Sequence, residues 1–140
     1  MTTVHFPTHE LREHTSEIEL HIRAESLGDL LAEAGRALAT VQLAGANCVP
    51  GGAVRSIRVT SAGRELLLVD WLNELIFLAD LDHWVALEFE VDSISGTEVQ
   101  ARASGVTLEW RASRVKAATL HGLRVENVAG GLEADLILDV

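Results

Sequence analysis

The sequence predicts a single α+β domain in which a mostly antiparallel β-sheet packs against two helices. Three observations predict this class: a very apolar helical stretch over residues 65–80, several runs that alternate apolar and charged residues, and glycine-containing turns between those runs. A length of 140 residues suits one domain with one core, and no repeat or linker composition divides residues 1–140. The hydrophobic content of 48% excludes a disordered chain.

The stretch from Glu65 to Asp80 is expected to form the central, largely buried helix. Its sequence, ELLLVDWLNELIFLAD, is apolar on nearly every side, yet its two internal charges leave it short of a membrane span. The polar residues Asp70, Asn73 and Glu74 are spaced i, i+3, i+4, which stacks them on one helix face. We expect this stripe to be satisfied or solvated, and the rest of the helix to be packed.

The remaining elements are expected to cover that helix. Apolar residues at helical spacing follow the N-cap Ser26 and predict a helix over residues 27–43, which the NCVPGG turn at residues 47–52 separates from the next strand. A tight turn at residues 95–97 makes the strands on its two sides antiparallel neighbours. Alternation of apolar and polar residues predicts the following strands: 17–24, around 57–59, 84–94, 99–103, 115–128 and 132–140.

Charge and cysteine content narrow the class of protein. The formal charge is −10, from 21 acidic and 11 basic residues, whereas strong nucleic-acid binding needs clustered Lys and Arg. We therefore expect any connection with nucleic acid to run through a protein partner. The single Cys48 cannot form an internal disulfide, and the N-terminal sequence has no signal-peptide pattern, so we expect a cytoplasmic protein without membrane segments.

No catalytic motif stands out. The sequence has no P-loop, GxGxxG or GxSxG pattern, and its six histidines lack the spacing of a zinc site, so we expect no catalytic residue. All basic residues are arginine except Lys116. This observation alone supports a special role and an ordinary role for the lysine equally. The acidic residues are the richest chemical resource, because carboxylate and carbonyl oxygens are the ligands of Ca²⁺ and Mg²⁺.

Four segments together resemble the archease family. Residues 13–17, EHTSE, resemble the H-T-A-D motif before the first strand, and residues 65–78 resemble the helix E-L-L-V-x-W-L-N-E-L-L-F. Residues 115–123, VKAATLHGL, resemble V-K-A-V-T-Y-H-G-L. The sequence ends in Asp139-Val140, where the family ends in Asp followed by an aliphatic residue. The order and spacing of these segments agree over nearly the whole chain.

The resemblance implies an accessory protein that is not itself an enzyme. Archeases assist the RNA-splicing ligase that joins tRNA halves, promoting its guanylylation from GTP and its turnover. An older proposal makes them chaperone-like modulators of a tRNA cytosine methyltransferase. Lys116, His14 and His121 lie in the matching motifs and are expected to act on the partner. Each histidine could instead orient a carboxylate or satisfy a backbone group.

The resemblance also implies a divalent metal, with Ca²⁺ expected and Mg²⁺ or Mn²⁺ as alternatives. Family members bind it through the acidic residue of H-T-A-D and the C-terminal Asp with its neighbour, which here are Glu17, Asp139 and Val140. Glu17 stands where the family usually has Asp, and Leu120 where it often has Tyr. If the first and last strands pair, the two carboxylates meet at one sheet edge, and Val140 adds a carbonyl or terminal carboxylate oxygen.

A small metal-dependent enzyme using the same carboxylates remains the alternative from a different class. Such an enzyme needs a concave pocket with a nucleophile or base beside the metal, whereas an accessory factor can carry its groups at an exposed tip. A chaperone-like binder is expected to show an exposed apolar patch instead. These three expectations differ in what the structure places around Glu17 and Asp139.

Overall fold

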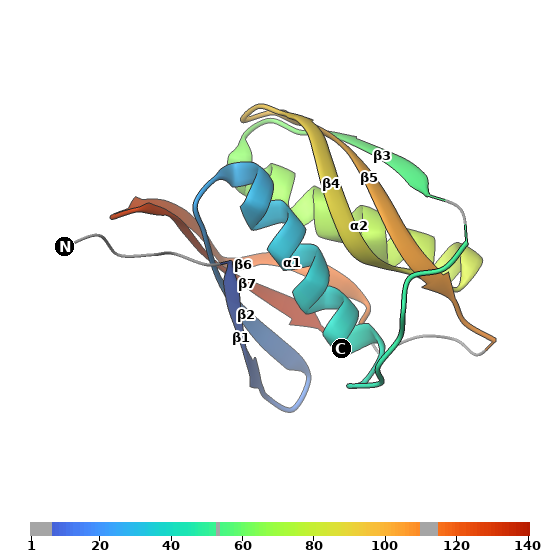
Figure 1. Cartoon of the computed structure of the whole chain (residues 1–140). Coiled ribbons are helices and arrows are strands. Elements are labelled where there is room, and N and C mark those ends of the chain that lie inside the picture. The colour runs from blue at the N-terminus through green and yellow to red at the C-terminus, as the bar shows by residue number, and fades with distance from the viewer. Residues whose placement is uncertain (1–6, 53, 110–114) are drawn as a thin grey trace.

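Two antiparallel sheets and two helices make up the part of the chain that the computed structural model describes, residues 7–52, 54–109 and 115–140 (Figure 1). The elements follow one another in this order: β1 (Thr8–Glu13), β2 (Glu17–Ala24), α1 (Leu27–Gln42), β3 (Arg55–Thr60), α2 (Arg64–Asp82), β4 (Trp84–Ile94), β5 (Glu98–Thr107), β6 (Ala117–Val128) and β7 (Gly131–Asp139). The predicted α+β class and both predicted helices are confirmed.

The strands divide between a four-stranded and a three-stranded sheet. The first has the order β1-β2-β7-β6 and the second has the order β3-β5-β4, with antiparallel pairing throughout. The hairpin predicted around residues 95–97 is confirmed as β4 and β5. β1 was not predicted, because its sequence THELRE has one aliphatic residue, Leu11, and no apolar alternation.

Both helices connect the two sheets. α1 packs on β2 of the first sheet and on β4 of the second, while α2 packs on β6 and on β4 (Figure 1). Along β2 and β7, buried side chains alternate with half-buried or exposed ones. This alternation is expected of a strand with one face on a core. α1 begins at the predicted N-cap, where the Ser26 hydroxyl accepts a hydrogen bond from the Asp29 N–H.

Trp71 joins the two helices in the centre of the core. Its side chain is fully buried, and its indole N–H donates a hydrogen bond of 2.8 Å to the Leu31 carbonyl of α1. Its ring meets Phe89 of β4 edge to face, with 5.6 Å between the centroids. One side chain of α2 therefore contacts both α1 and the second sheet.

α2 is central, as predicted, but its solvent face is wider than the predicted polar stripe. Leu66, Phe77 and Leu81 are 37%, 54% and 62% exposed. The expectation that this helix is packed on nearly every side is wrong at these positions, because hydrophobicity alone does not show which apolar side chains find a neighbour. No helix among the described residues is long and apolar enough to cross a membrane.

Asn73 covers an edge of the first sheet. Its amide donates to the Ala118 carbonyl at 3.2 Å and accepts from the Ala118 N–H at 2.8 Å. β6 is an edge strand, so these two bonds take the place of a missing neighbouring strand. Asp70, in the same predicted stripe, accepts a hydrogen bond from the Ser61 hydroxyl. Two of the three stripe residues are therefore satisfied by the fold.

Replacing Asn73 by Leu is expected to lower the free energy of unfolding by about 1–3 kcal/mol, because both backbone groups of Ala118 lose their partner in a partly buried position. The matched control is Glu74→Gln, since Glu74 makes no hydrogen bond or ion pair in the described structure. Urea unfolding of the two variants measures the difference. Equal unfolding midpoints would show that water satisfies the edge as well as the amide does.

Candidate functional site

Glu17 and Asp139 lie directly opposite each other at the ends of two neighbouring strands. β2 and β7 pair antiparallel, with Glu17 in register with Asp139. The Val140 N–H donates to the Ser16 carbonyl at 3.1 Å, which extends the ladder by one position. Glu17 and Asp139 then form the adjoining non-hydrogen-bonded pair, in which Cα atoms are about 4.5 Å apart and side chains are closest. We call Glu17, Asp139 and Val140 the strand-end site.

The two carboxylates of this site lack a compensating charge. Both residues are half-buried, and neither side chain makes a hydrogen bond or an ion pair in the described structure. Like charges directly opposite each other in a sheet are destabilising, so this pair favours a cation between them. Their oxygens are the ligand type that Ca²⁺ and Mg²⁺ prefer, which makes the donor set suitable for a hard divalent cation.

The strand-end site offers few protein ligands for a metal ion. Among the described residues, no group of three or more His, Cys, Asp or Glu side chains could hold a metal ion. A cation at Glu17 and Asp139 would therefore need Val140 or water for its remaining ligands. The Val140 side chain packs against the core, which holds this residue in place beside the two carboxylates.

Lys116 lies next to the strand-end site. Its backbone N–H donates a hydrogen bond of 2.8 Å to the Asp139 carbonyl, and the residue after it, Ala117, is in register with Asp139. The Lys116 side chain is exposed and makes no hydrogen bond or ion pair in the described structure. The structure thus places the backbone of Lys116 beside that of Asp139, and its ammonium forms no salt bridge with either carboxylate in the described structure.

The two histidines of the resembling motifs lie apart from the carboxylates. The His14 N–H donates to the Glu17 carbonyl at 2.8 Å, but its ring faces Glu19 at 3.5 Å. His121 lies in an irregularity of β6 between Thr119 and Arg124, four residues after Ala117, the residue in register with Asp139, or up to about 13 Å along the strand. The described structure shows no hydrogen bond or ion pair between either ring and the strand-end site, and the action of both histidines on a partner stays a prediction.

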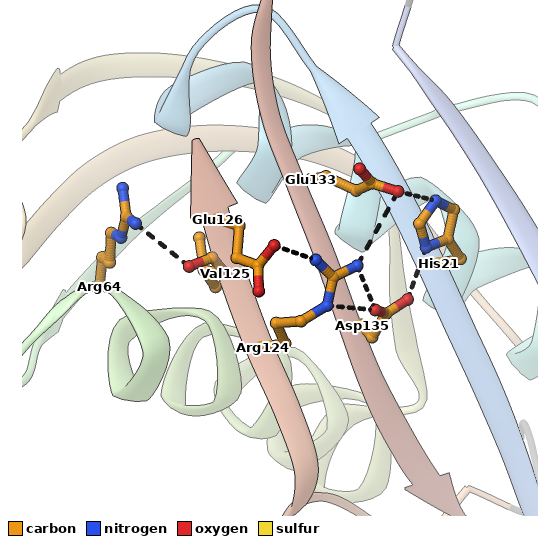
Figure 2. A network of polar contacts seen from close by, with 7 residues as sticks. All are labelled: His21, Arg64, Arg124, Val125, Glu126, Glu133 and Asp135. Atoms are coloured by element: carbon orange, nitrogen blue, oxygen red, sulfur yellow. Dashed lines mark hydrogen bonds and ion pairs between the residues drawn. The ribbon is translucent and has the colours of Figure 1, made fainter. Parts of the chain in front are cut away.

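A second polar cluster crosses the outer face of the first sheet, and the sequence did not reveal it. Figure 2 shows Arg124 of β6 and His21 of β2 reaching Asp135 of β7 from opposite sides. His21 Nδ1 lies 2.5 Å from Asp135, His21 Nε2 lies 2.8 Å from Glu133, and Arg124 Nε lies 2.7 Å from Asp135. Arg124 also contacts Glu126 at 2.6 Å. Alternation places these residues outward, but only the register shows that they meet.

A pocket of about 710 Å³ lies above β1, β2 and β7, and part of the cluster lines it. His21 and Asp135 belong to its lining, whereas none of the strand-end residues does. Burial alone raises the pKa of the Asp135 carboxyl, but hydrogen bonds from His21 and Arg124 outweigh it and hold this pKa below its ordinary value of 3.8. This pocket and the candidate metal ligands are therefore separate features of the described structure.

Asp135→Asn is expected to lower stability by about 1–2 kcal/mol at neutral pH, the lower part of the range for charged hydrogen bonds because the carboxylate is partly exposed. The folded-state pKa is depressed, so wild-type Asp135 stabilises the fold above pH 3.8, and this advantage is lost as the pH falls through the folded-state pKa. Urea unfolding at neutral and acidic pH measures it.

The matched control for this prediction is Asp92→Asn, which breaks an exposed Asp92–Arg102 ion pair on the second sheet. Exposed pairs contribute little, so this variant should lose less stability than Asp135→Asn at neutral pH. A constant difference between wild type and Asp135→Asn at every pH would contradict the assignment of a depressed pKa to the Asp135 cluster.

These features define a small α+β protein in which two helices join two antiparallel sheets, with a paired-carboxylate site at the strand ends. Residues 9–140 match the model of the archease protein family (MTH1598/TM1083). The chain belongs to the archease family. It is 31% identical to the archease of Methanosarcina mazei over 140 residues, which is 94% of this chain and 95% of that protein. It is also 31% identical to the archease of Archaeoglobus fulgidus, over 91% of this chain and 96% of that protein.

Solved structures agree with the fold. The solution structure of Methanobacterium thermoautotrophicum protein 1598 superposes with a TM-score of 0.71 at 25% identity, covering 94% of this chain and 98% of that one. The crystal structure of a Thermotoga maritima archease, described as a possible chaperone, superposes with a TM-score of 0.62 at 21% identity, covering 97% and 100%. The resemblance inferred from the four sequence segments is thus confirmed at the level of family and fold.

Proposed function

We propose that this protein is an accessory factor that activates an RNA-splicing (tRNA) ligase. In this role it promotes GTP-dependent guanylylation of the ligase and its turnover, and it acts with a divalent cation, expected to be Ca²⁺, at the strand-end site. Membership of the archease family supports the proposal. The observation that carries it is the exact register of Glu17 with Asp139, which joins two separate family motifs into one acidic site beside Lys116.

In this proposal, each residue of the strand-end site and the neighbouring Lys116 has its own role. Glu17 and Asp139 would hold the cation, and Val140 would complete the oxygen set. A bound divalent cation supplies positive charge that neutralises the two carboxylates and can attract anionic groups of a partner. Lys116 presents a point charge from the adjacent strand, where a compact ammonium can approach a phosphate or an acidic loop of the ligase.

The position of the site favours an accessory role over catalysis by this protein itself. The concave area on the first sheet contains His21 and Asp135 but none of the strand-end residues. A metal-dependent enzyme would place a base and a substrate cavity beside its metal. An accessory protein needs only to present its groups to another molecule, which half-buried groups at the ends of two strands allow.

The test is guanylylation of the RNA-splicing ligase from the same organism, measured with GTP and Ca²⁺, Mg²⁺ or Mn²⁺, with and without this protein. We expect the protein to accelerate formation of the ligase–guanylate adduct and to sustain repeated ligation. Ligase that is equally active with and without the protein, under every metal condition, would overturn the proposal. The double variant Glu17→Gln with Asp139→Asn tests whether this acceleration depends on the strand-end site.

The exposed apolar residues of α2 favour a second candidate, a chaperone-like modulator of a tRNA cytosine methyltransferase. Leu66, Phe77 and Leu81 form the kind of surface that a chaperone-like binder presents. The two candidates separate when the methyltransferase replaces the ligase in a parallel assay. Stimulation or protection of the methyltransferase alone would favour the second candidate, and stimulation of the ligase alone would favour the first.

A further inference from the structure

We propose that the exposed face of α2 docks a basic, amphipathic segment of the RNA-splicing ligase, and this inference rests on the proposed function. The α2 face consists of Leu66, Asp70, Glu74, Phe77 and Leu81. At 3.6 residues per turn these five residues fall within about 80° around the helix and extend over about 22 Å along it. They form one continuous stripe on a single element.

The apolar part of the α2 face is large enough to anchor a partner. Phe77 and Leu81 are one turn apart, and they are 54% and 62% exposed, although both stand on the most apolar helix of the chain. An exposed aromatic beside an exposed aliphatic residue on a rigid helix is typical of the anchors that dominate binding energy at interfaces. Burial by a partner would complete the packing that α2 lacks on this side.

The polar part of the α2 face sets the charge of the partner. Asp70 accepts a hydrogen bond from the neutral Ser61 hydroxyl, and Glu74 makes no hydrogen bond or ion pair in the described structure. The basic residue of α2, Arg64, lies at the helix start and is engaged with Val125 and Asn127 of β6. The face is thus apolar and acidic in a chain of net charge −10, and its complement is an apolar and basic segment.

The α2 face leads toward the strand-end site. Arg64 contacts Val125 and Asn73 contacts Ala118, so α2 runs antiparallel to β6. Phe77 and Leu81 follow Asn73 along the helix and therefore lie toward the beginning of β6, the end that carries Lys116. Ala118 is two residues from Lys116, or about 7 Å along an extended chain. A segment docked on α2 would hold the ligase near the strand end that carries Lys116 and Asp139.

The experiment measures binding of the ligase from the same organism by calorimetry, together with its guanylylation. The test variant is Phe77→Ser with Leu81→Ser, and the matched control is Val49→Ser, which removes an 83% exposed apolar side chain from the loop between α1 and β3. We expect the test variant to weaken the ligase Kd at least about tenfold and the control to bind like wild type.

Charge reversal provides a second variant that changes no apolar contact. Glu74→Lys should weaken binding at low salt and reduce the salt dependence of the Kd, because it places a like charge opposite the basic segment. Melting curves by circular dichroism identify any variant that has lost the fold. If the serine variant unfolds, the result for Glu74→Lys decides the inference.

The outcomes separate the docking surface from the proposed function. Wild-type protein that activates the ligase, with folded test variants that bind as tightly as wild type, would overturn docking on α2 and leave the proposed function intact. Wild-type protein that neither binds nor activates the ligase would overturn both. Test variants that bind weakly but still activate at saturating concentration would support α2 as the docking surface and the strand-end site as the activating one.

Discussion

Trp71→Ala is expected to lower the free energy of unfolding by about 3–5 kcal/mol, the usual cost of removing a large aromatic side chain from a packed core. The indole is fully buried between α1, α2 and β4, so its loss leaves a cavity and removes the bond to the Leu31 carbonyl. This is a large part of the total stability of a domain of this size. Urea unfolding followed by circular dichroism measures the change.

Trp71→Phe is the control for that prediction. The phenyl ring keeps much of the apolar volume and an aromatic partner for Phe89, and it loses the indole N–H and the remaining ring volume. Its cost should therefore be clearly smaller than that of Trp71→Ala. If the two variants unfolded at the same urea concentration, the hydrogen bond to Leu31 would matter more than the packing of the ring.

Lys116→Arg is expected to keep the fold and reduce activation of the ligase at least about tenfold, because a wide guanidinium cannot replace a compact ammonium at a close phosphate or acidic loop. The Lys116 side chain is exposed and makes no hydrogen bond or ion pair in the described structure, so the stability cost should stay within about 0–1 kcal/mol. Melting temperature and guanylylation rate are measured on the same preparation.

The backbone of Lys116 does contribute to the sheet through its bond to Asp139, and this contact is independent of the side chain. Full activation by the Arg variant would show that any positive charge suffices at this position. A Lys116→Arg protein that no longer folds would assign the side chain to the structure of the domain. Lys116→Ala then tests whether positive charge is needed at all.

The strand-end site shows how far the sequence predicts a functional arrangement. Alternation identified β2 and β7 as half-buried strands, and the motifs identified Glu17 and Asp139 at their outer ends. The two residues can meet only if β2 and β7 pair, and the sequence alone does not show this pairing. The structure pairs the two strands antiparallel, with Glu17 in register with Asp139. The resemblance to the family motifs supplied the two residues, and the apolar face of each strand fixes the side of the sheet on which their side chains lie.

Other contacts could not be predicted because they join elements through polar side chains that carry no periodic signal. β1 is held at the sheet edge with few apolar residues, and His9 from it bonds at 2.7 Å to the buried Glu33 of α1. The link from Asn73 to Ala118 likewise depends on where α2 crosses β6. The exposure of Phe77 was not predicted for a different reason: it depends on whether another element packs against that side of α2.

Glu17, like Leu120, is a position at which this chain departs from the archease motifs. The family usually has Asp at this position, and Glu adds one methylene between the strand and the carboxylate. In a pair of directly opposed residues, this extra length changes the reach of one ligand while the backbone register stays fixed. We expect a cation to bind with Glu17 contributing directly or through water, and Ca²⁺ tolerates such variation better than Mg²⁺ does.

The most direct test of the central claim is calorimetric titration of Ca²⁺, Mg²⁺ and Mn²⁺ into wild-type protein and into Asp139→Asn. The account predicts one divalent cation per chain in wild type, with Ca²⁺ bound most readily, and a loss of affinity of about tenfold or more in the variant, which removes one of two charged ligands. Equal binding by both proteins would contradict the claim that Glu17 and Asp139 share one cation.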